Sequence, residues 1–238
     1  MFRSQGKTIG FVPTMGALHG GHLSLIQTSV KQNDISIVSI FVNKTQFNEV
    51  NDFENYPKPI EKDVEVLQKN KVDYLYIPEY EDIYPDNYQF RVVESHDSTF
   101  LCGKSRKGHF EGVLTVVMKL LHIIAPDKAY FGEKDYQQYR LIDKMCKAFF
   151  LDVDIVPCPT IREPDGLAMS SRNLLLSEKE RIIAGQFPAL LQSDQTPSEI
   201  AAKLEQLGFR IDYITDTDGR RFGAVYLGNV RLIDNVEL

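Results

Sequence analysis

Ile35-Ser-Ile-Val-Ser-Ile-Phe-Val42 is the stretch that decides the fold class. Its dense run of apolar and β-branched residues is typical of a central strand in a parallel sheet, which is buried on both faces. An earlier β-rich run at residues 8–13 leads through a glycine-rich turn into a helical pattern at residues 22–32, where Leu23, Ile26 and Val30 share one face. Strand, helix and strand in this order predict parallel strands joined by right-handed connections.

The same alternation continues for most of the chain. The sequence predicts helices at residues 60–70, 110–124 and 135–149, and strands at residues 74–77, 89–93, 128–131 and 153–156. The segment 110–124 is apolar on nearly every side, which indicates a buried helix. We therefore expect an α/β fold in a first domain of residues 1–176, a Rossmann-like parallel sheet with helices on both faces. Ligands should bind beyond the carboxyl ends of its strands.

The character of the sequence changes after Ser177. Helical patterns at residues 178–191 and 198–208 flank a polar link, and two strands follow at residues 209–214 and 223–227. Asp216-Thr-Asp-Gly219 joins these strands, which predicts a hairpin. We expect a small α+β domain over residues 177–238.

Composition excludes several classes of protein. Of the 238 residues, 43% are hydrophobic and 25% are charged, so a disordered or collagen-like chain is excluded. The net charge is −6 and no run of Lys or Arg stands out, so neither nucleic acid nor a membrane is an expected partner. Three cysteines without Cys-x-x-Cys spacing indicate no disulfide framework or zinc site and fit a reducing compartment. The apolar runs are too short for a signal peptide or a bilayer span, so we expect a soluble, cytoplasmic protein.

The first motif that carries chemistry is Pro13-Thr-Met-Gly-Ala-Leu-His19-Gly-Gly-His22, between the first strand and the first helix. Unpaired N–H groups and a positive partial charge make a helix N-terminus attractive to phosphate, and glycines let the backbone approach it. Two histidines three residues apart can both donate to phosphate oxygens. A tight turn with histidine caps is the alternative. The pattern is neither a dinucleotide-binding fingerprint nor a P-loop.

Two more polar turns follow predicted strands. Asn43 and Gln46 come after the strand at residues 35–42, where their carboxamides could fix a small polar substrate; ordinary loop polarity is the alternative. Lys134 and Asp135 stand between a strand and a helix, where a lysine opposes the helix dipole unless a phosphate binds there. Asp135 could cap the helix or hold a ribose hydroxyl, and Gln138 lies one turn later.

The fourth turn is Asp165-Gly-Leu-Ala-Met169-Ser-Ser-Arg172-Asn173. Two hydroxyls and a guanidinium at the start of a helix can hold a triphosphate, because arginine makes planar, bidentate contacts. A capping serine beside an incidental arginine is the alternative. Together the four turns predict one nucleotide site, with the histidine motif on one side of the phosphates and residues 169–172 on the other.

With these motifs in view, the chain resembles the pantoate–β-alanine ligase family, in the nucleotidyltransferase superfamily that is related to class I aminoacyl-tRNA synthetases. The resemblance is dense over residues 10–173 and resumes at residues 226–235. The motifs that carry it are Phe11-Val-Pro-Thr-Met-Gly-Ala-Leu-His19, Ser39-Ile-Phe-Val-Asn43, Glu111-Gly-Val-Leu-Thr-Val-Val117, Phe131-Gly-Glu-Lys-Asp-Tyr-Gln-Gln138, Asp165 through Asn173, and Tyr226-Leu-Gly-Asn-Val-Arg-Leu-Ile-Asp-Asn235.

This resemblance implies an ATP-dependent ligase that condenses pantoate with β-alanine. The products are pantothenate, AMP and pyrophosphate, and a pantoyl adenylate is the intermediate. Mg²⁺ is implied together with ATP, although no carboxylate cluster in the sequence identifies its protein ligands. The resemblance also suggests a homodimer.

Roles for single residues are likewise implied by the resemblance. The catalytic residues would be His22, as the proton donor, with His19, Lys134 and Arg172. Gln46 and Gln138 would bind pantoate, and Gln46 also the incoming β-alanine. ATP would contact Met15, Gly16, Ala17, Leu18, His19, Gly20, Gly21, His22, Gly132, Glu133, Lys134, Asp135, Ile161, Met169, Ser170, Ser171 and Arg172. Asn43, Tyr56 and His109 are further candidates for the pocket wall.

The chain departs from the family pattern at three places. Lys44 stands where the family usually has proline, the chain begins almost at the first strand, and its C-terminal part is a few helical turns shorter than usual. Two other functions stay open on the residues. One is a nucleotidyltransferase of the same superfamily that joins a nucleotide to a phosphorylated substrate, and the other is a non-catalytic nucleotide-binding protein.

Overall fold

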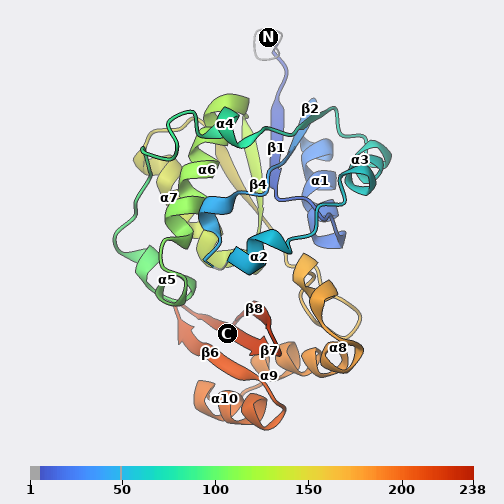
Figure 1. Ribbon diagram of the computed structural model, residues 1–238, viewed down its shortest axis with the longest axis vertical. Helices are drawn as coiled ribbons and strands as arrows, with labels where there is room; N and C mark the ends of the chain where they lie inside the picture. The colour runs from blue at the N-terminus through green and yellow to red at the C-terminus, as the bar shows by residue number, and fades with distance from the viewer. Residues whose placement is uncertain (1–5, 49) are drawn as a thin grey trace. The chain divides into compact units, whose positions relative to one another are not determined.

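A five-stranded parallel sheet forms the first part of the protein (Figure 1). The structure is a computed structural model that describes residues 6–48 and 50–238. The strands follow the spatial order β3-β2-β1-β4-β5, and every pair is parallel. Their bounds are β1 Ile9–Thr14, β2 Ile35–Ile40, β3 Tyr74–Tyr76, β4 Lys128–Gly132 and β5 Asp154–Cys158. The predicted parallel sheet is confirmed, and the stretch quoted first supplies one of its inner strands.

The order of the strands sets the position for a ligand. The chain runs from β1 outward to β2 and β3, then returns to place β4 on the other side of β1. At such a switch point the loops after the two neighbouring strands diverge and leave a crevice at their carboxyl ends. The loop after β1 carries the histidine motif, and Glu133 directly follows β4.

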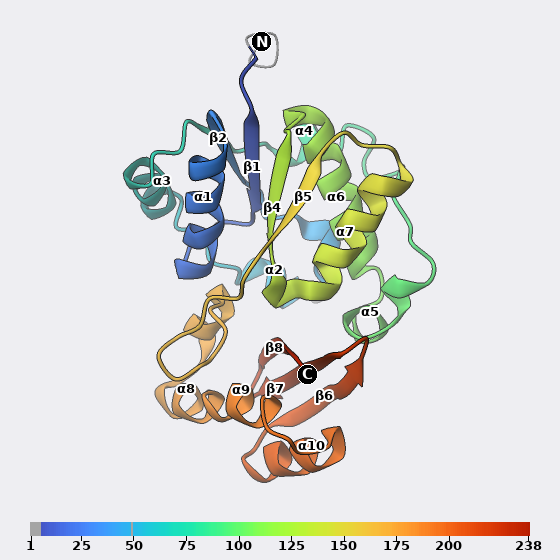
Figure 2. The same cartoon turned by 180° about the vertical axis from the view of Figure 1, so that it is seen from behind.

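Helices flank this sheet in both views (Figures 1 and 2). The long ones are α1 Gly20–Gln32, α3 Ile60–Lys69, α6 His109–Ile124 and α7 Tyr136–Ala148, each within two residues of its predicted bounds. Shorter turns are η2 Lys44–Gln46, α2 Val50–Glu54, α4 Tyr80–Ile83, η3 Asp97–Thr99, α5 Cys102–Ser105 and η4 Glu133–Asp135. As predicted, α6 is buried on most of its surface. Helix α1 packs closely on β1, because a Cβ at Gly10 would lie 2.4 Å from Ser29 Oγ.

The strand predicted at residues 89–93 is absent, and this prediction was wrong. The segment is irregular, and the backbone N–H of Val92 donates to the Thr115 hydroxyl (2.9 Å) rather than to a neighbouring strand. Phe90 and Val93 are 78% and 67% exposed. Despite its β-rich composition, this segment therefore joins neither sheet in the described part of the chain.

A second compact unit comprises Lys134–Tyr136 and Pro159–Leu238. Its strands β6 Arg210–Thr217, β7 Arg220–Leu227 and β8 Val230–Glu237 form an antiparallel sheet in the order β6-β7-β8. Its helical segments are η5 Ser171–Leu175, α8 Glu178–Ala184, α9 Gln186–Leu191 and α10 Pro197–Gln206. The unit has its own core, centred on fully buried Phe187, Leu191, Ile200 and Leu204.

Two predictions for this unit need correction. The helix predicted at residues 178–191 is two helices that meet at Gly185, where a Cβ would lie 2.8 Å from Asp165 Oδ2. Strand β8 was missed because Asp234 and Asn235 interrupt its apolar pattern. Both are buried, and arginines satisfy them: Arg162 pairs with Asp234 at 2.6 Å and Arg220 donates to Asn235 at 2.6 Å.

The division of the chain also differs from the predicted boundary between residues 176 and 177. The longer segment of the second unit begins at Pro159, and the ion pair from Arg162 to Asp234 ties residues 159–176 to the antiparallel sheet. All three cysteines are buried free thiols. Within the described ranges, we find no helix with the length and apolar character that a membrane crossing requires.

Candidate active site

The loop after β1 presents the N-terminus of α1. Gly16 and Ala17 both have a left-handed backbone, with φ of +79° and +51°, and His19 is the N-cap residue. The first turn of α1, a helix that the structure describes in full, has no acidic side chain. The positive end of the helix dipole is therefore not neutralised from within the helix, as an anion-binding terminus requires.

The two histidines of this loop combine both readings of the motif. His19 Nδ1 accepts from the Gly21 N–H (3.1 Å), and His22 Nδ1 accepts from the His19 N–H (3.4 Å), which closes a reciprocal cap. The rings lie 4.1 Å apart between centroids. Because each Nδ1 acts as an acceptor, the proton of each neutral ring is on Nε2. Capping thus leaves both rings with an N–H donor at the far end.

A buried carboxylate holds the same loop from behind. Asp63, on α3, is 2% exposed and accepts from the Ala17 and Leu18 N–H groups, both at 2.8 Å. Charge-assisted bonds of this kind stabilise by about 1.5–3 kcal/mol each. They hold Ala17 in a backbone conformation that a residue with a Cβ adopts at a cost of about 1–3 kcal/mol.

The loop after β2 carries the two predicted carboxamides. Asn43 is buried, and its Nδ2 donates to Gln46 Oε1 (3.1 Å) and to the Gly112 carbonyl (3.3 Å). The other end of the Gln46 side chain, Nε2, lies 3.4 Å from Met15 Sδ. Since Met15 belongs to the histidine motif, this contact joins the first two predicted turns inside one unit.

The backbone of Gln46 is fixed by α6 and the segment before it. His109 Nδ1 donates to the Gln46 carbonyl at 2.8 Å, because that oxygen can only accept, and Arg106 donates to His109 Nε2 at 2.9 Å. Gly112 lets α6 approach the backbone of this loop closely, because a Cβ there would lie 2.6 Å from the Thr45 carbonyl oxygen. Tyr56, the third wall candidate, is buried and packs edge-on against Phe47, 5.7 Å between centroids.

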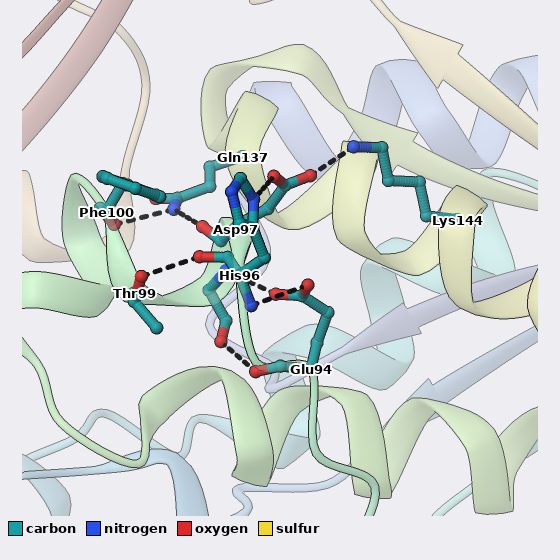
Figure 3. Close-up of polar contacts among 8 residues, drawn as sticks. Glu94, His96, Asp97, Thr99, Phe100, Gln137 and Lys144 are labelled. Carbon is teal, nitrogen blue, oxygen red and sulfur yellow. Dashed lines mark hydrogen bonds and ion pairs between the residues drawn. The ribbon is translucent and has the colours of Figure 1, made fainter.

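The two consecutive glutamines of α7 have different surroundings. Gln137 uses its whole carboxamide inside the protein. Its Oε1 accepts from the Cys102 N–H. Its Nε2 donates to the carbonyls of Asp97 and Phe100 (Figure 3). Lys144 pairs with Asp97 on the same segment. Gln138 is half-buried in the first turn of α7, directly after η4. Gln138 therefore remains the candidate for substrate contact.

In the second unit, the sheet carries the Lys134 turn. Asn235 Nδ2 donates to the Lys134 carbonyl at 3.0 Å, and the Arg220 guanidinium stacks 4.1 Å over the Tyr136 ring. The Lys134 ammonium lies 3.6 Å from Asp135 Oδ2 and is only 19% exposed. Asp135 thus partly neutralises the lysine that the helix dipole disfavours.

The turn at residues 161–173 belongs to the same unit. The Ile161 carbonyl accepts from the Met169 N–H at 2.9 Å, which joins the two ends of this turn. Ser170 is the N-cap of η5 and its hydroxyl accepts from the Arg172 N–H (3.3 Å). The predicted helix start and capping serine are both present.

A sequence profile described as pantoate-β-alanine ligase matches residues 1–237. The chain belongs to this family. The pantothenate synthetase of Bdellovibrio bacteriovorus is 52% identical over 99% of this chain and 94% of its own length. That of Legionella pneumophila, strain Lens, is 47% identical over 98% and 92%. Membership of the pantoate–β-alanine ligase family makes the chain an enzyme.

Solved structures of the pantoate–β-alanine ligase family share the fold. The Francisella tularensis enzyme, in a complex with β-γ ATP and β-alanine, superposes with a TM-score of 0.95 at 46% identity and covers 98% of this chain and 90% of its own. The pantothenate synthetase of Thermus thermophilus has a TM-score of 0.89 at 37% identity, with 97% and 93% covered.

Three residues that support the predicted turns carry no marked signal in the sequence. Asp63 lies in a Glu-Lys-Asp run that is typical of a solvated helix face, yet it is buried. Tyr84 follows a short helix and reaches Asn43 from 41 residues away. Asn235 ends a motif that carries the family resemblance, and the resemblance implies no role for it. Only the tertiary fold shows that each one supports a predicted turn.

Proposed function

We propose that this chain condenses pantoate with β-alanine at the expense of ATP, through a pantoyl adenylate, to give pantothenate, AMP and pyrophosphate. The observation that carries the proposal is the contact between Gln46 and Met15, which joins the carboxamide loop to the anion-binding end of α1. Family membership and the β-γ ATP and β-alanine in the Francisella relative support the same substrates.

In the first half-reaction a carboxylate oxygen of pantoate attacks the α-phosphorus, and the bond to the β-phosphate breaks. Negative charge then collects on the leaving pyrophosphate. The Nε2–H groups of His19 and His22, together with the N-terminus of α1, would stabilise this charge, with His22 as the proton donor. In the second half-reaction the neutral amine of β-alanine attacks the acyl carbon, AMP leaves with the electron pair of the broken C–O bond, and the nitrogen releases a proton to solvent as the amide forms.

Binding of pantoate is assigned to Gln46 and Gln138. Asn43 Nδ2 donates to Gln46 Oε1, so the N–H donors of the Gln46 carboxamide are directed away from Asn43. Donors of this kind suit the carboxylate and hydroxyl oxygens of pantoate. Positioning of the carboxylate oxygen in line with the α-phosphorus would supply much of the rate enhancement.

The remaining ATP contacts are assigned from the resemblance. Lys134 and Arg172 would bind phosphate, Asp135 the ribose, and Ile161 the adenine, while residues 169–172 would cover the triphosphate. Two contacts within the second unit support these roles. Asn235 Nδ2 donates to the Lys134 carbonyl and holds the Lys134 turn, and the Ser170 hydroxyl accepts from the Arg172 N–H and fixes the backbone at Arg172.

We propose that Mg²⁺ enters with ATP, bound mainly by phosphate oxygens. Such a mode fits this chain, because among residues 6–48 and 50–238 no three His, Cys, Asp or Glu side chains gather at a point where they could hold an ion. Magnesium commonly binds through substrate phosphates and water with few protein ligands.

Product analysis tests the proposed function against its rival. Purified protein is incubated with ATP, Mg²⁺, pantoate and β-alanine, and the nucleotide products are separated by chromatography. Release of AMP with one pantothenate per AMP supports the ligase. A nucleotide that stays attached to the second substrate would indicate the nucleotidyltransferase, and no turnover by folded protein would indicate the non-catalytic alternative.

We further propose a homodimer that works in the cytoplasm, without nucleic acid or membrane partners. The exposed Phe90 and Val93 offer an apolar surface for a second copy, and three free thiols suit a reducing compartment. Sedimentation of wild type and of Phe90→Ser checks the assembly: the wild type should be a dimer that the variant weakens. A monomeric wild type at micromolar concentration would contradict it.

A further inference from the structure

A buried tyrosine hydroxyl reaches the substrate loop from outside the predicted motifs. Tyr84 follows α4 and is 1% exposed. Its hydroxyl donates to Asn43 Oδ1 at 2.9 Å and lies 3.4 Å from the Thr45 hydroxyl. It is thus a buried polar group that the proposed chemistry does not use and that contacts the loop carrying Gln46.

The ring of Tyr84 is held on several sides. Tyr80 lies 4.9 Å and Tyr88 5.2 Å away between centroids, the latter at 90°, and Phe41 lies at 6.3 Å. Burial raises the pKa of Tyr84, so its hydroxyl keeps its proton at every pH at which the protein would work. The hydroxyl is therefore a permanent donor in a fixed place.

This donor helps to fix the direction of two carboxamides in succession. Asn43 Oδ1 accepts from the Tyr84 hydroxyl, from the Thr45 hydroxyl (3.0 Å) and from the Thr45 N–H (3.4 Å), so the Asn43 amide nitrogen faces the other way, toward the Gly112 carbonyl. That nitrogen donates to Gln46 Oε1. The oxygen of Gln46 is thereby occupied, and its Nε2 faces Met15 of the histidine motif.

We infer that Tyr84 is a positioning residue of the ligase: acting through Asn43, its hydroxyl keeps the N–H donors of Gln46 directed at the substrate. The inference rests on the proposed function, in which Gln46 contacts pantoate. It adds that Gln46 selects for an oxygen acceptor, a carboxylate or a hydroxyl, over an ammonium group. Without the hydroxyl, Asn43 keeps its bonds to Thr45 and to the Gly112 carbonyl but loses its 2.9 Å donor, so its carboxamide is held less firmly. Gln46 would then present its oxygen to the substrate more often than in the wild type.

Tyr84→Phe tests this with the loss of one oxygen, and Tyr80→Phe removes a hydroxyl from the neighbouring ring as the matched control. We expect the KM for pantoate to rise about tenfold in Tyr84→Phe, equivalent to about 1.4 kcal/mol. The KM for ATP should change less than about twofold. Tyr80→Phe should leave both constants as in the wild type. An unchanged pantoate KM, or an equal rise in both constants, overturns the inference.

A second measurement does not depend on turnover. The side-chain amide resonances of Gln46 are assigned by comparison with Gln46→Ala and followed by ¹⁵N NMR. They should shift or broaden in Tyr84→Phe and stay in place in Tyr80→Phe; unchanged resonances in both variants would overturn the inference. If the wild type shows no pantoate-dependent turnover, the proposed function fails, whereas an active wild type with a normal Tyr84→Phe variant overturns only the role of Tyr84.

Discussion

In His19 and His22, one ring nitrogen caps the helix and the other remains available to a ligand. The Nδ1 atoms close the cap of α1, and the Nε2–H groups are left as the donors that we propose for the ligase reaction. The sequence offered a cap and a phosphate contact as alternatives, and the structure makes them compatible. The orientation of Gln46 likewise depends on a hydrogen bond inside the protein. Asn43 Nδ2 donates to Gln46 Oε1, which leaves the Nε2 end of the Gln46 carboxamide to contact a substrate.

Gln46→Ala should weaken the use of pantoate more than the use of ATP. The reason is that the variant removes donors to substrate oxygens and leaves the cap of α1 intact. The KM for pantoate should rise about tenfold or more, as the loss of a hydrogen bond to a charged group of about 1.5–3 kcal/mol implies. Steady-state kinetics with each substrate varied check it, and a larger rise for ATP would mean that the loop is misassigned.

Lys44 stands at the position where the family resemblance leads us to expect proline. Its ammonium lies 3.9 Å over the Tyr80 ring, so a cation–π contact holds the turn instead. Such a contact contributes about 0.5–1 kcal/mol at an exposed site. Asn43 has φ −80° and ψ 106°, which suits a residue before proline, and proline is favoured at the first position of a helical turn.

We therefore expect Lys44→Pro to change the free energy of unfolding by less than about 1 kcal/mol, because proline contributes about 0.4–1 kcal/mol through the unfolded chain. Lys44→Ala loses the cation–π contact without this gain and should be the less stable of the two. Urea denaturation compares them. A Lys44→Pro variant less stable than Lys44→Ala would show that the turn cannot accept proline.

At the scale of elements, α3 supports the loop between β1 and α1 through Asp63. Asp63→Asn keeps the shape but presents an amide N–H to one backbone N–H. The ATP loop should lose its fixed conformation, with a KM for ATP raised about tenfold, the effect of one lost charge-assisted bond. Glu61→Gln, exposed on the same helix, is the control. Equal ATP constants in the two variants would remove Asp63 from the support of this loop.

Elements whose signal is local could be predicted from the sequence. Ile35–Ile40 and the buried α6 carry their own apolar pattern, and the four turns carry glycines or polar side chains next to predicted strands or helices. The run at residues 89–93 was mistaken for a strand because propensity cannot tell whether a partner strand exists. Strand β8 was missed since Asp234 and Asn235 become acceptable inside a sheet only through Arg162 and Arg220, which are distant in sequence.

At the scale of the whole molecule, carboxylates in both units set the response to acid. The Phe90 N–H and then Lys119 lower the pKa of Asp86 to about 2, and Arg181 lowers the pKa of Asp165. A carboxyl whose pKa is lower in the folded state stabilises above its unfolded pKa, near 4, and this contribution is lost as pH falls through the folded value.

The temperature of unfolding should therefore stay level near neutral pH and fall as the pH drops from about 4 to about 2. Calorimetry across this range checks it. Asp86→Asn should flatten the acid slope of the first unit, and Asp165→Asn that of the second. A slope that is the same in both variants as in the wild type would show that these pairs contribute nothing to acid stability.

The most direct measurement of the central claim is the exchange of labelled pyrophosphate into ATP without β-alanine. If α1 and the Gln46 loop form one site for pantoyl adenylate, the label enters ATP only when pantoate is present, and His22→Ala exchanges it at least about a hundredfold more slowly, as the loss of general acid catalysis implies. Exchange without pantoate, or undiminished exchange in folded His22→Ala, would contradict the account.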